Sequence, residues 1–278
     1  MADLPSHARV VIVVGGVMGV GLAYHLAHEG WGPEVVLLEK AELTSGSTWH
    51  AAGQITRSTS SFSLGRCVDY NIGLYSGALE AETGQAVTWH GCGSFRLAYT
   101  SDEMDWLRHT LSVGRALRFE MELVGPDRVA ELHPFYNLEG VLGALHTPDD
   151  GHVDPTNVTM AMATGARAKG ARIIRRCRAT NILRDGGEWA VETERGTIRC
   201  DHVVNAGGTY ARQMGEWSGL QLPMTSMTHH YFVTEPVPEF RDLETELPVI
   251  RDDRKVSGYI RMEQKRGLIG IYEKENPN

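Results

Sequence analysis

The sequence predicts a mixed α/β (α+β) fold, in which a parallel sheet and an antiparallel sheet are built from interleaved segments. Two buried-strand patterns, at 9–14 and 34–39, enclose a glycine-rich turn and a helix pattern. Such a β-α-β unit places both strands in one parallel sheet. Short strand patterns separated by turn signals recur after residue 170 and favour antiparallel pairing. At 278 residues, the chain can bury one large core or two modest domains.

The first β-α-β unit is the clearest local pattern. Residues 9–14 form a run of mostly β-branched residues, as expected of a buried parallel strand. A helix is predicted at 17–29, where Gly30 ends it. Its apolar face carries Val20, Ala23, Leu26 and Ala27.

The rest of the chain alternates helix and strand patterns. Helices are predicted at 64–82, 102–117 and 156–168. Strands are predicted at 94–99, 171–174, 189–194 and 203–206. The Asp185-Gly186-Gly187 turn predicts a hairpin, and a second hairpin is predicted at 257–272.

Charge and cysteine content narrow the functional class. Lys plus Arg total 27 against 35 Asp plus Glu, a net charge of −8. An acidic surface repels phosphate backbones, so we expect no nucleic-acid partner. The cysteines are far apart and form no CxxC pair: Cys67, Cys92, Cys177 and Cys200. We therefore expect buried thiols in a reducing compartment, with neither a disulfide framework nor a zinc site.

The N-terminus and the hydropathy pattern predict a cytoplasmic protein without a membrane partner. No apolar run reaches the length that spans a bilayer. Only residues 1–8 precede the first strand, which is too short for a signal or transit peptide.

The glycine-rich turn indicates a dinucleotide site. Backbone N–H groups and the helix dipole favour a pyrophosphate at a helix N-terminus, and glycines let the backbone approach it. Gly15 lies in this turn, and Gly16 and Gly19 fit the second and third glycines of GxGxxG. Val14 takes the first position, where a β-branched side chain does not easily adopt the turn geometry and would crowd the nucleotide.

An acidic residue ends the second strand of this unit. Glu39 lies where a carboxylate accepts hydrogen bonds from the two adenosine ribose hydroxyls, and it disfavours the 2′-phosphate of NADP. The alternative is a solvated charge at a strand end beside an ordinary tight turn. The strand–turn–helix–strand context favours the dinucleotide.

A loop of small and hydroxyl residues follows at 45–53 and can wrap closely around a large planar ligand. His50 lies within it, among residues too small to hide it. A histidine there could act as general base, metal ligand or nucleophile, or be structural, and the residues alone do not rank these roles.

Longer motifs carry a resemblance to a known family. The stretch 37–53 reads LLEKAELTSGSTWHAAG, and DGHVDP occupies 150–155. With further segments at 82–85, 93–98, 203–208, 227–234 and 267–273, these motifs resemble the dimethylglycine and sarcosine dehydrogenase family. These enzymes are amine-oxidising flavoproteins of the D-amino-acid-oxidase type. The resemblance implies FAD as cofactor, bonded covalently to His50.

The resemblance also implies a domain division. Residues 1–90 and 155–220 would form a Rossmann-like FAD-binding domain, and 91–154 and 221–278 an antiparallel-sheet substrate domain, incomplete at the C-terminus. The cofactor-binding residues expected from the turn, the loop and the resemblance are Gly15, Gly16, Gly19, Glu39, Lys40, Ser47, Thr48, His50, Ala51, Ala52, Gly53, Ala179, Ala206 and Gly207.

The implied reaction is oxidative N-demethylation of a small N-methylated amino acid. Hydride transfer to the flavin leaves an iminium ion, which releases formaldehyde or passes its one-carbon unit to tetrahydrofolate. We expect His229 and Tyr259 as catalytic residues and Tyr231 beside the substrate, with His229 and Tyr231 on one strand face. Arg261 or Arg251 would bind the substrate carboxylate. A structural role for His229 or His230 is the competing interpretation.

His152 and Asp154 allow two interpretations, one functional and one structural. The pair could indicate a metal or a proton relay, but a turn held by Asp154-Pro155 before a helix is favoured, and we expect no metal.

The sequence departs from the family pattern at two places, and these departures favour alternatives to an active demethylating enzyme. Val14 occupies a glycine position, and the chain ends where family members continue with a segment that closes over the flavin. The tetrahydrofolate step requires a further C-terminal domain. The alternatives are therefore a catalytically incompetent fragment or a noncovalent FAD amine oxidase. The electron acceptor, oxygen or an electron-transfer flavoprotein, is left open.

Overall fold

The computed structural model describes residues 3–272, so Glu273, where the family resemblance ends, lies outside the described residues. The chain divides into two compact units, each assembled from three segments. The first unit comprises Met1–Ala51, Ala78–Thr88 and Asp154–Met227. The second comprises Ala52–Gly77, Trp89–Val153 and Thr228–Asn278. Residues 52–77, which the sequence division assigned to the cofactor domain, thus fall in the second unit.

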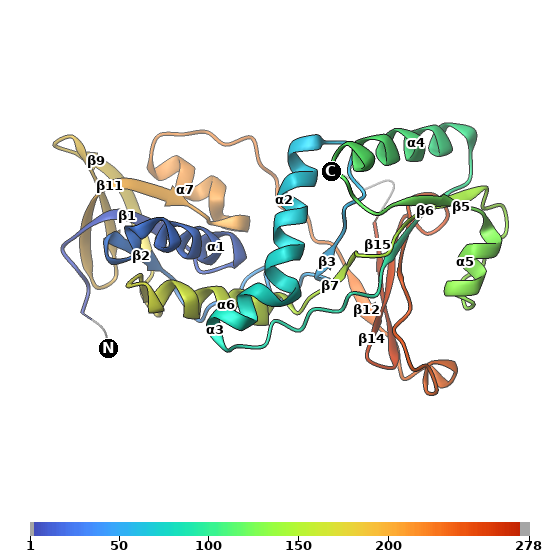
Figure 1. Cartoon of the computed structure of the whole chain (residues 1–278). Helices are drawn as coiled ribbons and strands as arrows, with labels where there is room; N and C mark the ends of the chain where they lie inside the picture. The colour runs from blue at the N-terminus through green and yellow to red at the C-terminus, as the bar shows by residue number, and fades with distance from the viewer. Residues whose placement is uncertain (1–2, 273–278) are drawn as a thin grey trace. The chain divides into compact units, whose positions relative to one another are not determined.

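The first unit contains a six-stranded sheet in the order β8-β2-β1-β11-β10-β9 (Figure 1). Its strands are β1 (His7–Val13), β2 (Val35–Leu38), β8 (Arg172–Ile174), β9 (Ala179–Asp185), β10 (Glu188–Thr193) and β11 (Gly196–Asn205). β8, β2, β1 and β11 are parallel, and β10 and β9 continue the sheet antiparallel. The predicted β-α-β crossover is confirmed.

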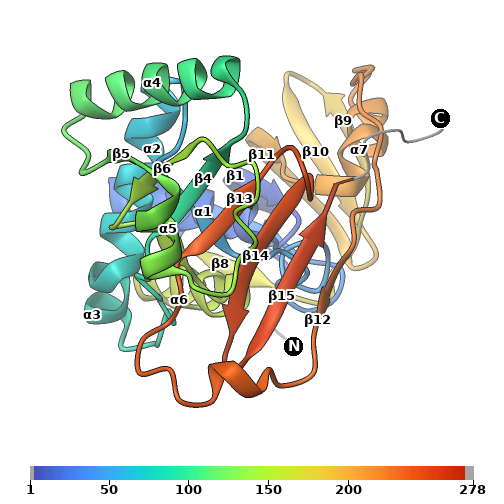
Figure 2. The ribbon, with the colours of Figure 1, turned by 90° about the vertical axis from the view of Figure 1, so that its right-hand side faces the viewer.

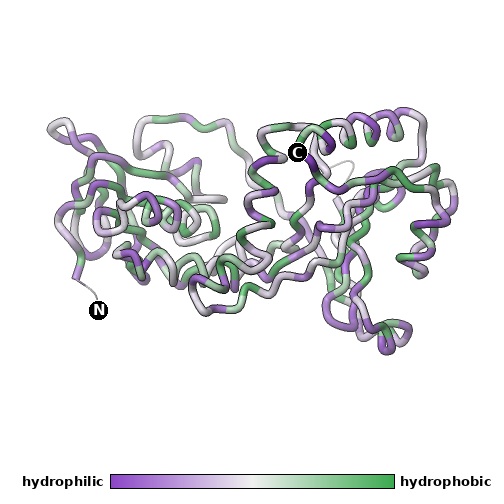
Figure 3. The backbone as a smooth tube through the Cα atoms, in the orientation of Figure 1, coloured by the Kyte–Doolittle hydropathy of each residue, from purple (hydrophilic) through white to green (hydrophobic). Residues whose placement is uncertain are grey.

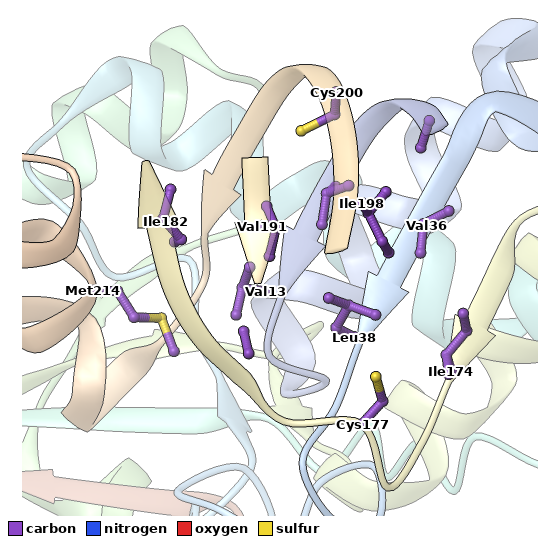
Figure 4. Packing of buried hydrophobic residues seen from close by; sticks show 13 residues of the cluster. Val13, Val36, Leu38, Ile174, Cys177, Ile182, Val191, Ile198, Cys200 and Met214 are labelled. Carbon is purple, nitrogen blue, oxygen red and sulfur yellow. The ribbon is translucent and has the colours of Figure 1, made fainter. Parts of the chain in front are cut away.

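Helices and one hydrophobic cluster complete this unit. The helices are α1 (Val17–Leu26), the π-helical η1 (Ala27–Trp31), the 3-10 turns η2 (Gly32–Glu34) and η4 (Gly208–Tyr210), α3 (Leu79–Thr83), α6 (Pro155–Ala168) and α7 (Ala211–Trp217). α1 packs against α6, where Gly165 makes room for the ring of Tyr24. Figure 4 shows the core on the sheet, with Met214 reaching it from α7.

Three sequence expectations change, two in this unit and one, at Cys67, in the second. The helix predicted to stop at Gly30 continues as a π-turn to Trp31, with Gly30 at a φ of 87°. β9 was missed, and it is the hairpin partner of β10 across the Asp185-Gly186-Gly187 turn. Its sequence ATNILRD places polar residues within the strand, so its apolar pattern is weak. Cys67 is exposed, so the expectation that all four thiols are buried is wrong, although all four are free.

The second unit contains a seven-stranded sheet in the order β12-β15-β14-β13-β4-β6-β5 (Figure 2). Its strands are β4 (Ser94–Ala98), β5 (Glu122–Val124), β6 (Gly143–Thr147), β12 (Tyr231–Val233), β13 (Val249–Asp252), β14 (Gly258–Glu263) and β15 (Arg266–Ile271). All pairs are antiparallel except β13 with β4. β3 (Gln54–Ile55) and β7 (Gly151–His152) form a separate ribbon. The predicted C-terminal hairpin is confirmed as β14 and β15.

The helices of the second unit are α2 (Phe62–Gly73), α4 (Ser101–Ala116), α5 (Pro126–Leu132) and the 3-10 turn η5 (Pro238–Phe240). The helix predicted at 64–82 is interrupted by the π-turn η3 (Leu74–Ala78), in which Gly77 has a φ of 156°. α4 begins with a capping box formed by Thr100 and Glu103. Figure 3 shows both hydrophilic and hydrophobic turns along α4, as expected of an amphipathic helix.

Among residues 3–272, no helix combines the length and apolar character needed to cross a membrane.

Candidate functional site

The glycine-rich turn brings the end of β1 onto the N-terminus of α1. Gly16 is the N-cap of α1 and provides no side-chain cap, so the first turn presents its backbone N–H groups. A Cβ atom at Gly19 would lie 2.1 Å from the Val14 carbonyl oxygen, so only glycine permits this approach. Helix and strand are therefore as close as a dinucleotide turn requires.

Val14 adopts the backbone conformation that glycine normally supplies. Its φ is 91°, while its N–H donates to the Leu38 carbonyl at 2.8 Å and its side chain packs against the core of the unit. A β-branched residue in this region stores strain on the order of 1–3 kcal/mol. The turn thus keeps its geometry despite the valine.

Glu39 is not a solvated strand-end charge, because only 4% of it is exposed. Its Oε2 accepts from the Gly15 N–H and its Oε1 from the Ala41 N–H, both at 2.8 Å. A carboxylate offers about four acceptor positions, so each oxygen keeps one for a ribose hydroxyl. The arrangement fits the adenosine end of a dinucleotide.

The loop after β2 folds back onto the helix start. Thr48 Oγ1 accepts from the Val17 N–H at 3.0 Å and lies against Gly16. Ser47 Oγ lies 3.4 Å from Thr209 Oγ1, and Lys40 Nζ lies 3.9 Å from the Tyr210 ring. η4, which follows Ala206 and Gly207, is thereby brought to the same loop.

The remaining cofactor-site candidates occupy more than one place. Ala206 lies beside Gly19, and the Gly207 N–H donates to Asn205 Oδ1 at 3.0 Å. Ala179 is buried at the start of β9. Ala51 closes the first unit, whereas Ala52 and Gly53 belong to the second, where the Gly53 carbonyl accepts from the Val153 N–H.

His50 is exposed, and its ring packs on that of Trp49 with centroids 4.1 Å apart. Its Nδ1 lies 3.1 Å from the Gly46 carbonyl oxygen. Because a carbonyl only accepts, Nδ1 holds the hydrogen of the neutral ring, and Nε2 keeps its lone pair. Among residues 3–272, the groups of three side chains that could hold a metal ion do not include His50.

In the second unit, one row of paired residues crosses the seven-stranded sheet. Tyr231 pairs with Gly270, Gly270 with Tyr259, Tyr259 with Arg251, and Arg251 with Arg96. Residues paired across strands project to the same face. The row therefore places two tyrosines and two arginines on one face of this sheet.

An aromatic cluster lies at one end of this row. The His229 ring stacks on Tyr272 with centroids 4.2 Å apart and lies 6.1 Å from Tyr259. Burial and the neighbouring Tyr272 raise the pKa of Tyr259, so it stays protonated at neutral pH. The expectation that His229 and Tyr231 share a strand is wrong, because β12 begins only at Tyr231. Sequence reasoning did not identify Tyr272 as a member of this cluster. The available signal was its position two residues after Gly270, which pairs with Tyr259, because residues two apart in an extended chain project to the same side.

Arg261 and Arg251 differ sharply in their freedom to bind a ligand. Arg261 is 6% exposed, and it donates to the Ala52 and Met262 carbonyls at 2.9 and 2.7 Å and pairs with Glu263 at 2.8 Å. Arg251 lines a pocket and shares Asp253 with Arg96, at N–O distances of 2.7 and 2.6 Å. Two arginines against one aspartate leave a net positive charge.

The pocket beside these arginines also holds unsatisfied polar atoms. It is lined by Gln54, Thr56, Ser58, Ser94, Phe95, Arg96, Val249 and Arg251. Gln54 Nε2 and Ser58 Oγ are buried without a hydrogen-bond partner. Buried donors of this kind, beside a positive charge, suit a small anion such as a carboxylate.

Asp154 and His152 make unrelated contacts in the structure. Asp154 caps α6 by accepting from the Asn157 N–H at 2.8 Å, which confirms the turn interpretation. His152 instead lies 2.7 Å from a Glu246 oxygen, through its Nε2.

Comparison with known proteins identifies the family of this chain. The family described as DAO, FAD dependent oxidoreductase, matches residues 9–278. The mitochondrial dimethylglycine dehydrogenase of Rattus norvegicus is 42% identical over 97% of this chain, and the mitochondrial sarcosine dehydrogenase of Mus musculus is 33% identical over 97%. This chain spans 31% and 29% of their lengths. The crystal structure of L-proline dehydrogenase from P. horikoshii superposes with a TM-score of 0.83 at 24% identity, covering 96% of this chain and 70% of that one. The expected resemblance and fold class are confirmed.

Proposed function

This chain belongs to the FAD dependent oxidoreductase (DAO) family, and we propose that it oxidises a small N-methylated amino acid of the dimethylglycine or sarcosine type. The observation that carries the proposal is the cross-strand row of the second unit. This row sets an aromatic cluster beside an arginine-lined pocket, which suits the amine and the carboxylate of one small molecule.

The first unit fits FAD. The N-terminus of α1, where Gly16 provides no side-chain cap and Thr48 accepts from the Val17 N–H, suits the pyrophosphate, and the spare acceptor positions of Glu39 suit the ribose. Gly15, Gly16 and Gly19 allow the turn to pack closely on Leu43, Thr48 and Val14, since a Cβ atom at any of them would come within 3.0 Å of one of these residues. When bound, the flavin supplies a hydride acceptor.

His50 would carry the flavin. Its exposed ring is oriented by the Gly46 carbonyl, and Nε2 is left as the nucleophilic nitrogen. This assignment follows the family resemblance of the STWHAAG motif at 47–53, and the orientation of the ring supports it.

The substrate would be held by charge at one end and by aromatic rings at the other. Arg251 and Arg96 would bind its carboxylate, which makes Arg251 the stronger of the two arginine candidates. The protonated Tyr259 would donate a hydrogen bond, and His229 would accept the ammonium proton, because hydride loss requires the free amine lone pair.

The later fate of the product stays a prediction. Hydrolysis of the iminium would release formaldehyde, and transfer to tetrahydrofolate would need a further domain. The electron acceptor, oxygen or an electron-transfer flavoprotein, is left open. The cytoplasmic location stays a prediction.

The test uses the full chain and His50→Ala. After denaturation, flavin fluorescence should migrate with the wild-type polypeptide and be lost only in the variant. Anaerobic dimethylglycine or sarcosine should then bleach the flavin absorbance, and Arg251→Gln should require at least about tenfold more substrate.

Three outcomes would redirect the proposal. Flavin released on denaturation would indicate a noncovalent oxidoreductase. Flavin that is retained but never bleached would contradict the substrate assignment. Absence of flavin from both proteins would favour a catalytically incompetent chain.

A further inference from the structure

Two histidines of the second unit are held side by side by their backbones. His90 and His152 form an antiparallel bridge with N–O distances of 2.9 and 3.0 Å. Gly151 makes this possible, because a Cβ atom there would lie 2.0 Å from the His90 carbonyl oxygen. The two imidazoles stack with centroids 4.6 Å apart and an interplanar angle of 9°. The backbone therefore places the two histidine side chains next to each other.

Glu246 reaches both rings from a third segment. Its Oε2 lies 2.7 Å from His90 Nδ1, and its Oε1 lies 2.7 Å from His152 Nε2. Burial alone raises the pKa of Glu246, but the hydrogen bonds from the two histidines outweigh it, so the pKa is lowered and the group is a carboxylate at neutral pH. The proposed oxidation uses none of these three residues.

The cluster is sheltered but accessible. The His152 side chain is 5% exposed, Glu246 is 21% exposed and His90 is 42% exposed. A ligand can therefore enter past His90, while His152 provides a rigid inner position. The ligand atoms of all three residues lie within 4.8 Å of one another.

We propose that His90, His152 and Glu246 bind a divalent transition-metal ion, with Zn²⁺ as the best-suited ion. Two imidazole nitrogens and one carboxylate oxygen are the donor set of three-ligand zinc sites, which leave a fourth position open. The metal takes the place of the hydrogens between each ring and the carboxylate. A neutral ring has a single N–H, so in the metal-bound form that hydrogen lies on the nitrogen facing away from the ion, and a ring that was protonated releases its second proton to solvent.

Binding the ion requires both rings to turn as well as Glu246 to shift, because zinc lies in the plane of each imidazole that binds it and the two stacked planes are only 9° apart. Zinc bonds of about 2.0–2.2 Å in a tetrahedron separate the ligand atoms by roughly 3.3–3.5 Å. Each 2.7 Å contact must therefore widen by less than about 1 Å. Glu246 lies between η5 and β13, outside any helix or strand, so its side chain can make this shift. The bound ion would link three chain segments and stabilise the second unit.

The full chain would be titrated with ZnCl₂ by calorimetry, and its melting temperature recorded with and without the ion. We expect one saturable equivalent and a raised melting temperature. His90→Gln and Glu246→Gln should each weaken binding by more than about tenfold. Glu122→Gln is the matched control, because it removes the carboxylate from another His–Glu pair of this unit, His146 with Glu122 at 3.1 Å. It should leave zinc affinity unchanged.

Circular dichroism of each variant would establish that it folds, and His90→Gln, at the most exposed ligand, is the mildest change. Absence of saturable binding to the wild type would overturn the proposal. Binding that survives both His90→Gln and Glu246→Gln would also overturn it, since the ion would then lie elsewhere.

Discussion

Val14 is the residue at which the nucleotide turn departs from its usual composition. Its φ of 91° lies where glycine is at ease and a β-branched residue is strained. In an ordinary strand, alanine is more stable than glycine by roughly 0.5–1 kcal/mol. Here we expect that order to reverse, with Val14→Gly more stable than Val14→Ala by about 1 kcal/mol.

Urea unfolding of both variants measures this difference directly. Both variants lose the two methyl groups of Val14 from the core, and alanine keeps Cβ, so a more stable glycine variant can arise only from its backbone preference. Equal stabilities, or a more stable alanine variant, would show that Val14 is not strained.

Asp150 should make stability depend on pH. Burial raises its pKa to about 7, although hydrogen bonds from Ser94 and from the Arg57 N–H oppose the shift. In the unfolded chain the carboxyl ionises near its ordinary pKa of 3.8. Its contribution to stability is therefore complete below about pH 4, falls as the pH rises toward 7, and is then constant.

Asp150→Asn mimics the protonated side chain. Relative to this variant, the wild-type free energy of unfolding should fall by up to roughly 4 kcal/mol between pH 4 and 7. Chemical unfolding at intervals of pH checks this expectation. A difference that rises with pH would mean that the native carboxyl is ionised.

At the residue scale, local spacing places Glu39 and Thr48 where the structure has them, against the glycine turn and the start of α1. The role of His50, which comes from the motif at 47–53, stays a prediction. Tyr272 and the Arg251 pocket depend on which residues face one another across four strands. Register of that kind is set by tertiary pairing, so local patterns do not show it.

Among elements, periodic helices and β-branched strands were predictable, whereas breaks and polar strands were not. The helix expected at 64–82 is interrupted at Gly77, whose positive φ no local pattern specifies. β9 was missed because polar residues interrupt its alternation, although its hairpin turn was evident. Both failures arise where the packing of the unit overrides local preference.

The β14–β15 hairpin offers a sharp test of the aromatic cluster. A Cβ atom at Gly270 would lie 2.2 Å from Tyr259 Cζ, so Gly270→Ala must displace that ring. We expect a loss of about 2 kcal/mol or more in stability, together with weaker substrate binding. Urea unfolding and flavin bleaching would measure the two effects.

Gly267→Ala is the matched control in the same strand. Its nearest neighbour would be Thr234 Cγ2 at 3.6 Å, an ordinary contact. It should change stability by less than about 1 kcal/mol. Equal effects of the two substitutions would indicate a general intolerance of the hairpin and not contact with Tyr259.

The whole chain combines two units that each bury a core of their own. One core lies on the sheet of β1, β2 and β11, and another includes Phe95, Leu97 and Ile250 of the second sheet. Each unit is built from three segments of the chain, so neither can be read as a continuous stretch of sequence. Length allowed one large core or two modest domains, and the family resemblance implied the division into two. The transfer of residues 52–77 to the second unit accompanies the β3–β7 pairing, which local patterns do not show.

Separate cores predict two transitions on heating. Val14→Ala should lower one of them and Gly270→Ala the other, because each substitution perturbs one core. FAD added to the His50→Ala chain, which cannot hold the flavin covalently through that residue, should raise only the transition that Val14→Ala lowers, since a ligand stabilises the cooperative unit that binds it. Differential scanning calorimetry of the wild type and the three variants measures all three shifts. A single transition lowered equally by both substitutions would show that the two units unfold as one, and FAD would then raise it as a whole.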